Sequence, residues 1–107
     1  MDERNPSRFH RLAFDETWFF HDGVPLEVTF LGEESGRIRS VLLSRGNPQV
    51  LVPAAVWMAA RVAPGAGWAL AGCVVSPGFE YQDFERADRD RLLREFPGAR
   101  EIVEALG

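Results

Sequence analysis

Turn-forming residues interrupt residues 7–79 of this sequence at short intervals. They cluster at Asp22-Gly23, Ser35-Gly36, Gly46-Asn47-Pro48 and Pro64-Gly65. The apolar segments between these clusters are short, and isolated helices below roughly 12 residues are marginal in water. Short segments joined by tight turns are typical of β-sandwiches and β-barrels. The spacing therefore predicts an all-β fold for this part of the chain.

Apolar and polar side chains alternate within these segments, as expected of strands, whose successive residues point to opposite faces. In residues 24–31, Leu26 and Val28 share one face, and Glu27 and Thr29 the other. The turn after this segment predicts an antiparallel hairpin with residues 37–44. The predicted strands cover residues 7–13, 16–21, 24–31, 37–44, 49–52, 57–63 and 68–75.

Residues 57–63 are compatible with a helix as well as with a strand, because Met58, Ala59 and Ala60 favour helices. Pro53 precedes this segment and Pro64 follows it, which leaves little length for a stable helix. We therefore favour a strand here.

The C-terminal segment, residues 80–107, has the period of a helix. Leu92, Leu93 and Phe96 form one apolar stripe, which predicts a helix over 88–96 with Asp88 as its N-cap. Pro97 ends it, and a second helix is predicted over 99–106. We expect a single domain with a polar N-terminal arm (1–6), a β-barrel (7–79) and a helical segment (80–107).

Composition narrows the class of protein. A chain of 107 residues has room for one domain, and its net charge of −4 argues against a nucleic-acid groove or a basic membrane-binding face. No apolar run approaches the ~18 residues of a membrane span, and the first residues are too polar for a signal peptide. The one cysteine, Cys73, excludes an intrachain disulfide and predicts a reducing, cytoplasmic location. Its apolar neighbours predict an inert, buried thiol.

Two polar residues stand on successive predicted strands, and their parity allows both to face inward. These are His10 and Glu16. An imidazole and a carboxylate that converge inside a barrel could form a metal site or a proton-transfer pair. The alternative is a hydrogen-bonded core histidine beside a carboxylate that caps a turn. His21, next to a turn, is expected to face solvent.

Three acidic residues, Glu80, Asp83 and Glu85, follow the last predicted strand. They could form an acidic lip beside Tyr81 and Phe84. A solvated connection into the helices is the alternative.

The spacing of His10, Glu16 and Gly23 resembles the first motif of the cupins, and residues 53–58 align with the second. The finer resemblance is to an uncharacterised cupin branch of unknown function. It rests on five segments that recur in order over about residues 7–97. They are Arg8-Phe-His-Arg, Asp15-Glu-Thr-Trp-Phe-Phe, Asp22-Gly-Val-Pro-Leu-Glu, Val52-Pro-Ala-Ala-Val-Trp and Val75-Ser-Pro-Gly-Phe-Glu-Tyr-Gln-Asp-Phe-Glu. The resemblance implies a jelly-roll barrel, the double-stranded β-helix of cupins, with C-terminal helices.

The sequence departs from the cupin motifs at the residues that hold a metal ion. Leu12 and Met58 stand where two histidines are expected, and Ala55 replaces a glycine. Of the usual three histidines and one glutamate, His10 and Glu16 remain. A thioether is a poor ligand for hard or borderline ions. We therefore expect no cofactor and no tightly bound metal, with a weak or adventitious divalent ion at His10 and Glu16 if any.

Without a metal ion, the resemblance implies an aromatic pocket for a small organic molecule. The expected lining is His10, Leu12, Glu16, Trp18, Phe20 and Met58. Trp18 and Phe20 could equally fill the core, and core filling is favoured for Trp57, whose parity opposes that of Met58. Whether the chain is an enzyme stays open at this point.

One alternative is a metal-independent enzyme similar to the sugar epimerases among cupins, with His10 and Glu16 as its tentative catalytic residues. His10 would be the base and Glu16 would tune it. The general acid of such enzymes is often a tyrosine, and the one tyrosine, Tyr81, lies outside the predicted strands. A structural cupin dimer without a ligand is the third possibility. In each case we expect a homodimer.

Related cupins carry further N-terminal strands before the histidine motif, which starts here at His10. The resemblance thus implies a chain that is short at its N-terminus, either a minimal cupin, a truncated one, or one whose partner covers the missing sheet edge. Apolar faces left open in this way strengthen the expectation of a dimer.

Overall fold

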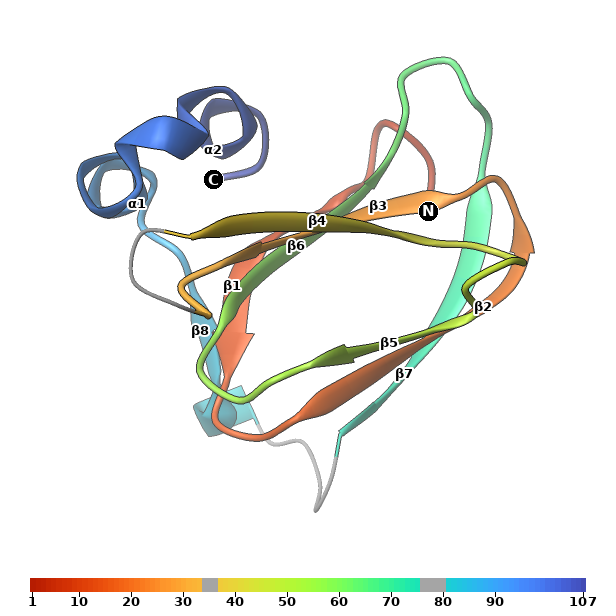
Figure 1. Cartoon of the computed structure of the whole chain (residues 1–107), viewed down its shortest axis with the longest axis horizontal. Helices are drawn as coiled ribbons and strands as arrows, with labels where there is room; N and C mark the ends of the chain where they lie inside the picture. Colours follow the sequence, from red (N-terminus) through yellow and green to blue (C-terminus); the bar gives the residue numbers. More distant parts are fainter. Residues whose placement is uncertain (34–36, 76–80) are drawn as a thin grey trace.

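Two antiparallel sheets pack face to face in the computed structural model, which describes residues 1–33, 37–75 and 81–107 (Figure 1). The five-stranded sheet has the order β4-β3-β6-β1-β8, and the three-stranded sheet has the order β5-β2-β7. The all-β sandwich with two C-terminal helices that the sequence predicts is confirmed. The strands are β1 (Ser7–Leu12), β2 (Glu16–Gly23), β3 (Leu26–Leu31), β4 (Ile38–Leu43), β5 (Gln49–Val52), β6 (Trp57–Val62), β7 (Ala69–Val75) and β8 (Phe84–Arg86).

The strands predicted over residues 7–75 are present, with ends within two residues of those expected. Strands β3 and β4 pair antiparallel from Leu26↔Leu43 to Leu31↔Ile38, so the predicted hairpin is confirmed. Residues 57–63 form a strand, β6, which lies between β3 and β1 in the sheet. One face of β6 lies in the core between the sheets and the other lies under the C-terminal helices, so tertiary packing here outweighs the helix propensity of its alanines.

The interior of the sandwich is apolar. Alternate residues of β3 (Leu26, Val28 and Phe30) point into it and are fully buried, as the alternation predicts. Trp18 from β2 and Met58 from β6 belong to the same cluster. This core joins the two sheets.

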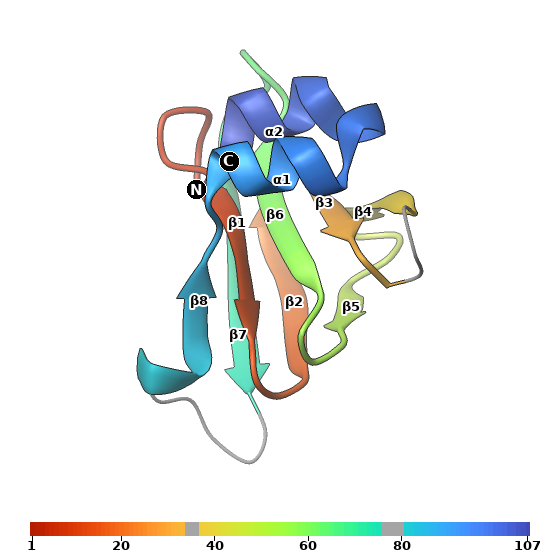
Figure 2. The same ribbon diagram turned by 90° about the vertical axis from the view of Figure 1, so that its left-hand side faces the viewer.

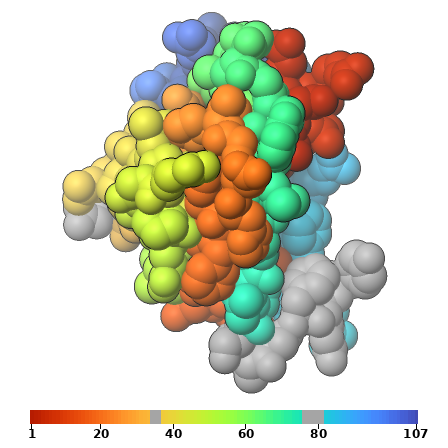
Figure 3. All heavy atoms as spheres, turned by 90° about the vertical axis from the view of Figure 1, so that its right-hand side faces the viewer, coloured from red at the N-terminus to blue at the C-terminus, as the bar shows by residue number. Residues whose placement is uncertain are grey.

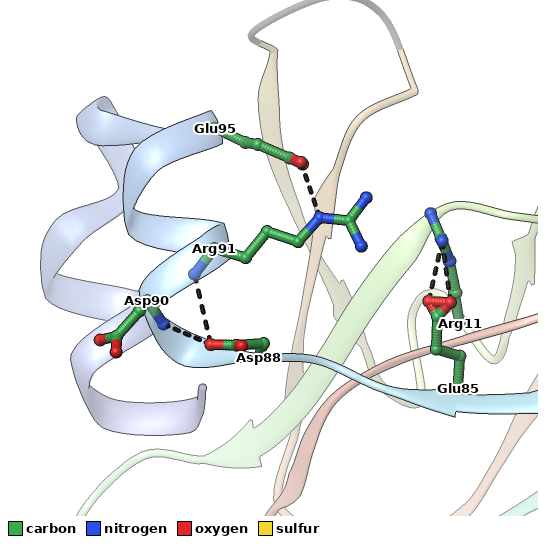
Figure 4. Close-up of polar contacts among 6 residues, drawn as sticks. All are labelled: Arg11, Glu85, Asp88, Asp90, Arg91 and Glu95. Carbon is green, nitrogen blue, oxygen red and sulfur yellow. Dashed lines mark hydrogen bonds and ion pairs between the residues drawn. The ribbon is translucent and has the colours of Figure 1, made fainter.

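Strand β8 departs from the sequence prediction, which assigns residues 80–107 to a helical segment. A short 3-10 helix (Tyr81–Asp83) leads into β8, which pairs antiparallel with β1. The Arg11 guanidinium lies 2.8 Å from the Glu85 carboxylate across this pair (Figure 4). The three residues of β8 are charged or aromatic and show no alternation of apolar and polar side chains. The strand forms by pairing with β1, which lies more than 70 positions earlier in the chain, so the local sequence does not indicate it.

This ion pair also bears on the acidic lip considered above. Glu85 is neutralised by Arg11, and Asp83 lies at the end of the 3-10 helix that leads into β8. Glu80 lies outside the described residues. His21 is exposed, as expected.

Two short helices cover the outer face of the five-stranded sheet (Figure 2). They are α1 (Arg89–Glu95) and α2 (Arg100–Leu106), joined by a 3-10 turn (Pro97–Ala99). The predicted N-cap is confirmed, since the Asp88 carboxylate accepts hydrogen bonds from the backbone N–H groups of Asp90 and Arg91 (Figure 4). Leu92, Phe96, Val103 and Leu106 pack on Phe9, Leu31, Trp57 and Ala59 of the sheet. Within the described ranges, no helix is long and apolar enough to cross a membrane.

Neither helix of the described ranges covers the outer face of the three-stranded sheet. Figure 3 shows β2 between β5 and β7 on this face, with the helices behind. Leu51 and Val74 flank Thr17 in register, and both are more than half exposed. Trp68 and Leu70 are exposed to a similar degree.

Candidate functional site

A cleft of about 420 Å³ opens between β1, β2 and β8. Its lining brings together three of the six pocket residues that the sequence predicts, namely His10, Glu16 and Trp18. Among the described residues, the lining consists of Pro6, Ser7, Arg8, His10, Glu16, Trp18, Phe84 and Arg86. The sheet register explains this grouping, because His10 is paired with Arg86 of β8, while Glu16 and Trp18 share the inward face of β2.

His10 lies on β1 with 8% of its surface exposed. Its Nδ1 atom is 2.7 Å from the backbone carbonyl oxygen of Arg8. Because a carbonyl oxygen only accepts hydrogen bonds, Nδ1 carries the proton, and in the neutral ring Nε2 keeps a free lone pair. The ring stacks on Phe84, with 5.2 Å between ring centroids and 23° between planes. The imidazole is therefore held in one orientation from two sides.

Glu16 begins β2 and is 7% exposed. Its Oε1 atom is buried and accepts no hydrogen bond from any described residue. Trp18, two residues further on the same face, is 6% exposed, and its indole Nε1 donor also lacks a partner in the described parts of the chain. An unpaired acceptor and an unpaired donor thus occur together in the lining of one cleft.

Cys73 on β7 lies opposite Trp18 in the register of β2 and β7. The sequence predicts a buried thiol, which is wrong, because Cys73 is exposed. The reason is the position of β7 at the edge of its sheet, which a run of apolar residues does not reveal. The pKa of the Cys73 thiol is raised to about 12. Partial burial of the thiol is the largest cause, followed by the charge and the hydrogen bond of Glu16.

The other three predicted pocket residues lie elsewhere. Leu12 is buried and lines a neighbouring cleft of about 400 Å³ with Arg11 and Ala55. Phe20 is partly buried and packs against the interior core. Met58 is 1% exposed within that core, on β6 opposite His10.

Trp57 follows the core-filling interpretation, since it packs beneath the helices on the other face of the sheet. Arg11 lies over its ring, with 4.3 Å from the guanidinium carbon to the ring centroid.

Sequence reasoning missed five residues of the cleft: Pro6, Ser7, Arg8, Phe84 and Arg86. Arg8 shares the parity of His10 on β1, and that parity is the signal that could have found it. Phe84 and Arg86 belong to β8, whose existence the sequence pattern does not indicate.

The donor set of the site does not fit a tightly held metal ion. Among the residues that the structure describes, no group of three or more His, Cys, Asp or Glu side chains could bind one. Catalytic zinc sites use three protein ligands, and the positions of two cupin histidines are taken here by Leu12 and Met58.

Comparison with known proteins gives a family and several similar structures, two of which are described here. The family model described as "Cupin superfamily (DUF985)" matches residues 1–87. A hypothetical protein from Leishmania major is 30% identical, with a TM-score of 0.86 over 99% of this chain and 71% of that chain. A protein from Shewanella oneidensis, solved by X-ray crystallography, is 33% identical, with a TM-score of 0.89 over 100% of this chain and 70% of its own. No curated protein matches.

Proposed function

Because this chain belongs to the cupin superfamily, in the family described as DUF985, we propose that it binds a small organic molecule in the cleft between β1, β2 and β8. The residues that bind it are His10, Glu16 and Trp18, and no tightly held metal ion takes part. Binding, rather than a named reaction, is the function that the geometry supports best.

The observation that carries this proposal is the pair of unpaired buried atoms, Oε1 of Glu16 and Nε1 of Trp18. A buried polar atom without a hydrogen bond costs about 1–3 kcal/mol. A hydroxyl group both donates and accepts, so one ligand hydroxyl can pair with the carboxylate and with the indole N–H. The lone pair of His10 Nε2 offers a further acceptor for a ligand donor.

Native mass spectrometry of the purified protein tests the proposal. We expect a population whose mass exceeds that of the chain by a small organic molecule, and we expect Glu16→Gln to lose it. Glu27→Gln is the matched control, because Glu27 is paired with Arg61 outside the cleft. A Glu16→Gln protein that retains the same molecule as the native protein would contradict the assignment of the site.

A second candidate function is metal-independent acid–base catalysis, with His10 Nε2 as the base. It is favoured by the hydrogen bond from Nδ1 to Arg8, which fixes the tautomer that leaves Nε2 free. A general acid is the missing part, since the side chain of Tyr81 lies outside the described part of the structure. Exchange of a ligand C–H for deuterium, lost in His10→Gln, would favour this function. Binding without exchange would favour the first.

We also propose a homodimer formed through the outer face of the three-stranded sheet. The support is the uncovered apolar surface of Leu51, Trp68, Leu70 and Val74, on the side of the sandwich that lacks helices. Exposed apolar residues gathered on one face can mark an interaction site, and a two-fold dimer can bury such a face against its copy.

Light scattering on a sizing column tests the dimer. Leu51→Glu is expected to give a monomer. Leu42→Glu is the matched control, an equally exposed leucine on β4 of the other sheet, and it is expected to remain a dimer. A monomeric native protein would contradict the proposal.

A further inference from the structure

Two arginines line the same cleft as the buried carboxylate. Arg8 comes from β1 and Arg86 from β8, and both are exposed. One guanidinium nitrogen of Arg8 donates to the backbone carbonyl of Ala105 at 3.3 Å, which leaves other donors of this group available. The side chain of Arg86 makes no hydrogen bond or ion pair with any residue in the described ranges.

The charges of this cleft run against those of the whole chain. The chain carries a net charge of −4, yet the lining residues that the structure describes include two guanidinium groups and one carboxylate. The carboxylate belongs to Glu16 and is buried, whereas both guanidinium groups are exposed. The mouth of the cleft is therefore positive and its wall holds an unpaired acceptor.

We propose that the ligand carries an anionic group, a phosphate monoester or a carboxylate, which Arg8 and Arg86 bind at the mouth of the cleft, while a hydroxyl of the same molecule pairs with Glu16 and Trp18. This inference rests on the proposed function and adds the chemical class of the ligand. Guanidinium groups pair with carboxylate and phosphate oxygens through charge-assisted hydrogen bonds, which are stronger than those between neutral groups.

The charge of Glu16 adds selectivity to this arrangement. A buried carboxylate repels an anion that enters without a donor, so the anionic end is kept at the arginines and the hydroxyl end is directed inward. The ligand class is thus a small hydroxylated anion with its charge at one end. The rings of Phe84 and Trp18 supply apolar contact along the cleft.

Four small probes separate the two halves of this proposal. Glycerol phosphate carries both groups, glycerol lacks the anion, propyl phosphate lacks free hydroxyls, and glycerate replaces phosphate by carboxylate. The readout is the indole N–H signal of Trp18 in proton–nitrogen correlation spectra, assigned with Trp18→Phe. The exposed indole of Trp68, outside the cleft lining, serves as the internal reference.

We expect glycerol phosphate or glycerate to shift the Trp18 signal with an affinity about tenfold above that of glycerol. Arg86→Gln and Arg8→Gln should each remove most of this gain, and added salt should weaken it. Arg45→Gln is the matched control, because Arg45 is exposed and lies outside the cleft lining. Propyl phosphate should bind more weakly than glycerol phosphate, because it has no free hydroxyl for Glu16.

Equal affinities for glycerol and the two anionic probes, or an Arg86→Gln protein that binds like the native one, would overturn the anion inference and leave the proposed function standing. No shift of the Trp18 signal with any probe would overturn the ligand class. The proposed function would then be judged by the native mass measurement, which needs no probe. Glycerol phosphate binding that is unchanged in Glu16→Gln would overturn both.

Discussion

The Nδ1 atom of His10 lies 2.7 Å from the carbonyl oxygen of Arg8, two residues earlier on the same strand. This contact gives the two ring nitrogens different roles, one in the fold and one toward a ligand. Nδ1 is occupied by the backbone, and Nε2 is available to a ligand or a proton.

Substitutions at His10 can test this separation. The amide nitrogen of asparagine can replace Nδ1 as the donor to Arg8, but asparagine has nothing at the position of Nε2. We expect His10→Asn to retain stability within about 0.5 kcal/mol and to lose ligand binding, whereas His10→Ala should also lose about 1–2 kcal/mol from the unpaired carbonyl. Urea denaturation and native mass spectrometry measure the two effects. Ligand binding retained in His10→Asn would show that Nε2 has no role.

Glu16 should show the opposite effects on stability and binding. Its carboxylate is buried with one unpaired oxygen, so the isosteric, neutral Glu16→Gln is expected to raise the free energy of unfolding by about 1 kcal/mol while weakening ligand binding. Glu27→Gln removes a partly buried ion pair with Arg61, and its effect is expected to stay below about 1 kcal/mol. A less stable Glu16→Gln protein would indicate that the carboxylate is already satisfied within the fold.

Cys73 should be less reactive than its exposure suggests. The pKa of the Cys73 thiol is raised from 9.0, its ordinary value in the unfolded chain, to about 12 in the folded state. Between these two pH values the thiol is protonated in the folded protein and ionised in the unfolded chain. The unfolded state then binds fewer protons than the folded state, so stability should fall as pH rises from 9 toward 12. Iodoacetamide alkylation near neutral pH should be slow, since the thiolate is the reactive form.

The same thiol provides a test of its contact with Glu16. Partial burial is the larger cause of the raised pKa and Glu16 the smaller one, so Glu16→Gln should lower the pKa and speed alkylation without restoring an ordinary thiol. The pH dependence of the alkylation rate in the two proteins measures this. Identical profiles would mean that the carboxylate does not act on the sulfur.

Gly23 occupies a position that no other residue can take. Its φ is +95°, and an added Cβ would collide with the backbone carbonyl oxygen of Trp68. We expect Gly23→Ala to cost at least about 2 kcal/mol of stability, from backbone strain together with this collision. Gly65→Ala is the matched control, because Gly65 has a φ of +75° and open space around it, so it isolates the strain alone. Equal losses in the two variants would exclude the collision.

Ala55 presents the reverse case, a residue with a side chain at a φ of 64°. This is the position where the cupin motif has glycine. Replacing it with glycine should stabilise the protein by up to about 1 kcal/mol, because the relief of left-handed strain exceeds the entropy lost by glycine on folding. The neighbouring Ala54→Gly should destabilise by a similar amount, as measured by thermal unfolding. A loss of stability in Ala55→Gly would contradict the strain.

Much of the fold could be predicted from the sequence, because its signals are local. Alternation in β3, the turn at Gly23 and the cap at Asp88 each act within a few residues of the element that they define. Strand β8 could not be predicted, because its pairing with β1 depends on contacts between distant parts of the chain, such as Arg11 with Glu85.

The candidate site was predictable to the same degree. His10, Glu16 and Trp18 follow from strand parity, and the structure places all three at one cleft. Met58 follows from the resemblance to the second cupin motif but lies deeper, in the packed core, because a motif position does not give the depth of a side chain. The burial of Cys73 was predicted wrongly for a related reason, since the order of strands decides which one lies at an edge.

Strand β8 forms one wall of the cleft and also connects the cleft to the helical layer. Directly after β8, the backbone N–H of Ala87 donates to the backbone carbonyl of Phe9, and the chain then enters α1 at its N-cap, Asp88. The Arg8 guanidinium, which lines the cleft, donates to the backbone carbonyl of Ala105 in α2. A local unfolding event that detaches the helices would therefore also pull away one side of the binding site. By mass action, an occupant of the cleft would protect the helical layer from opening, although no residue of either helix lines the cleft.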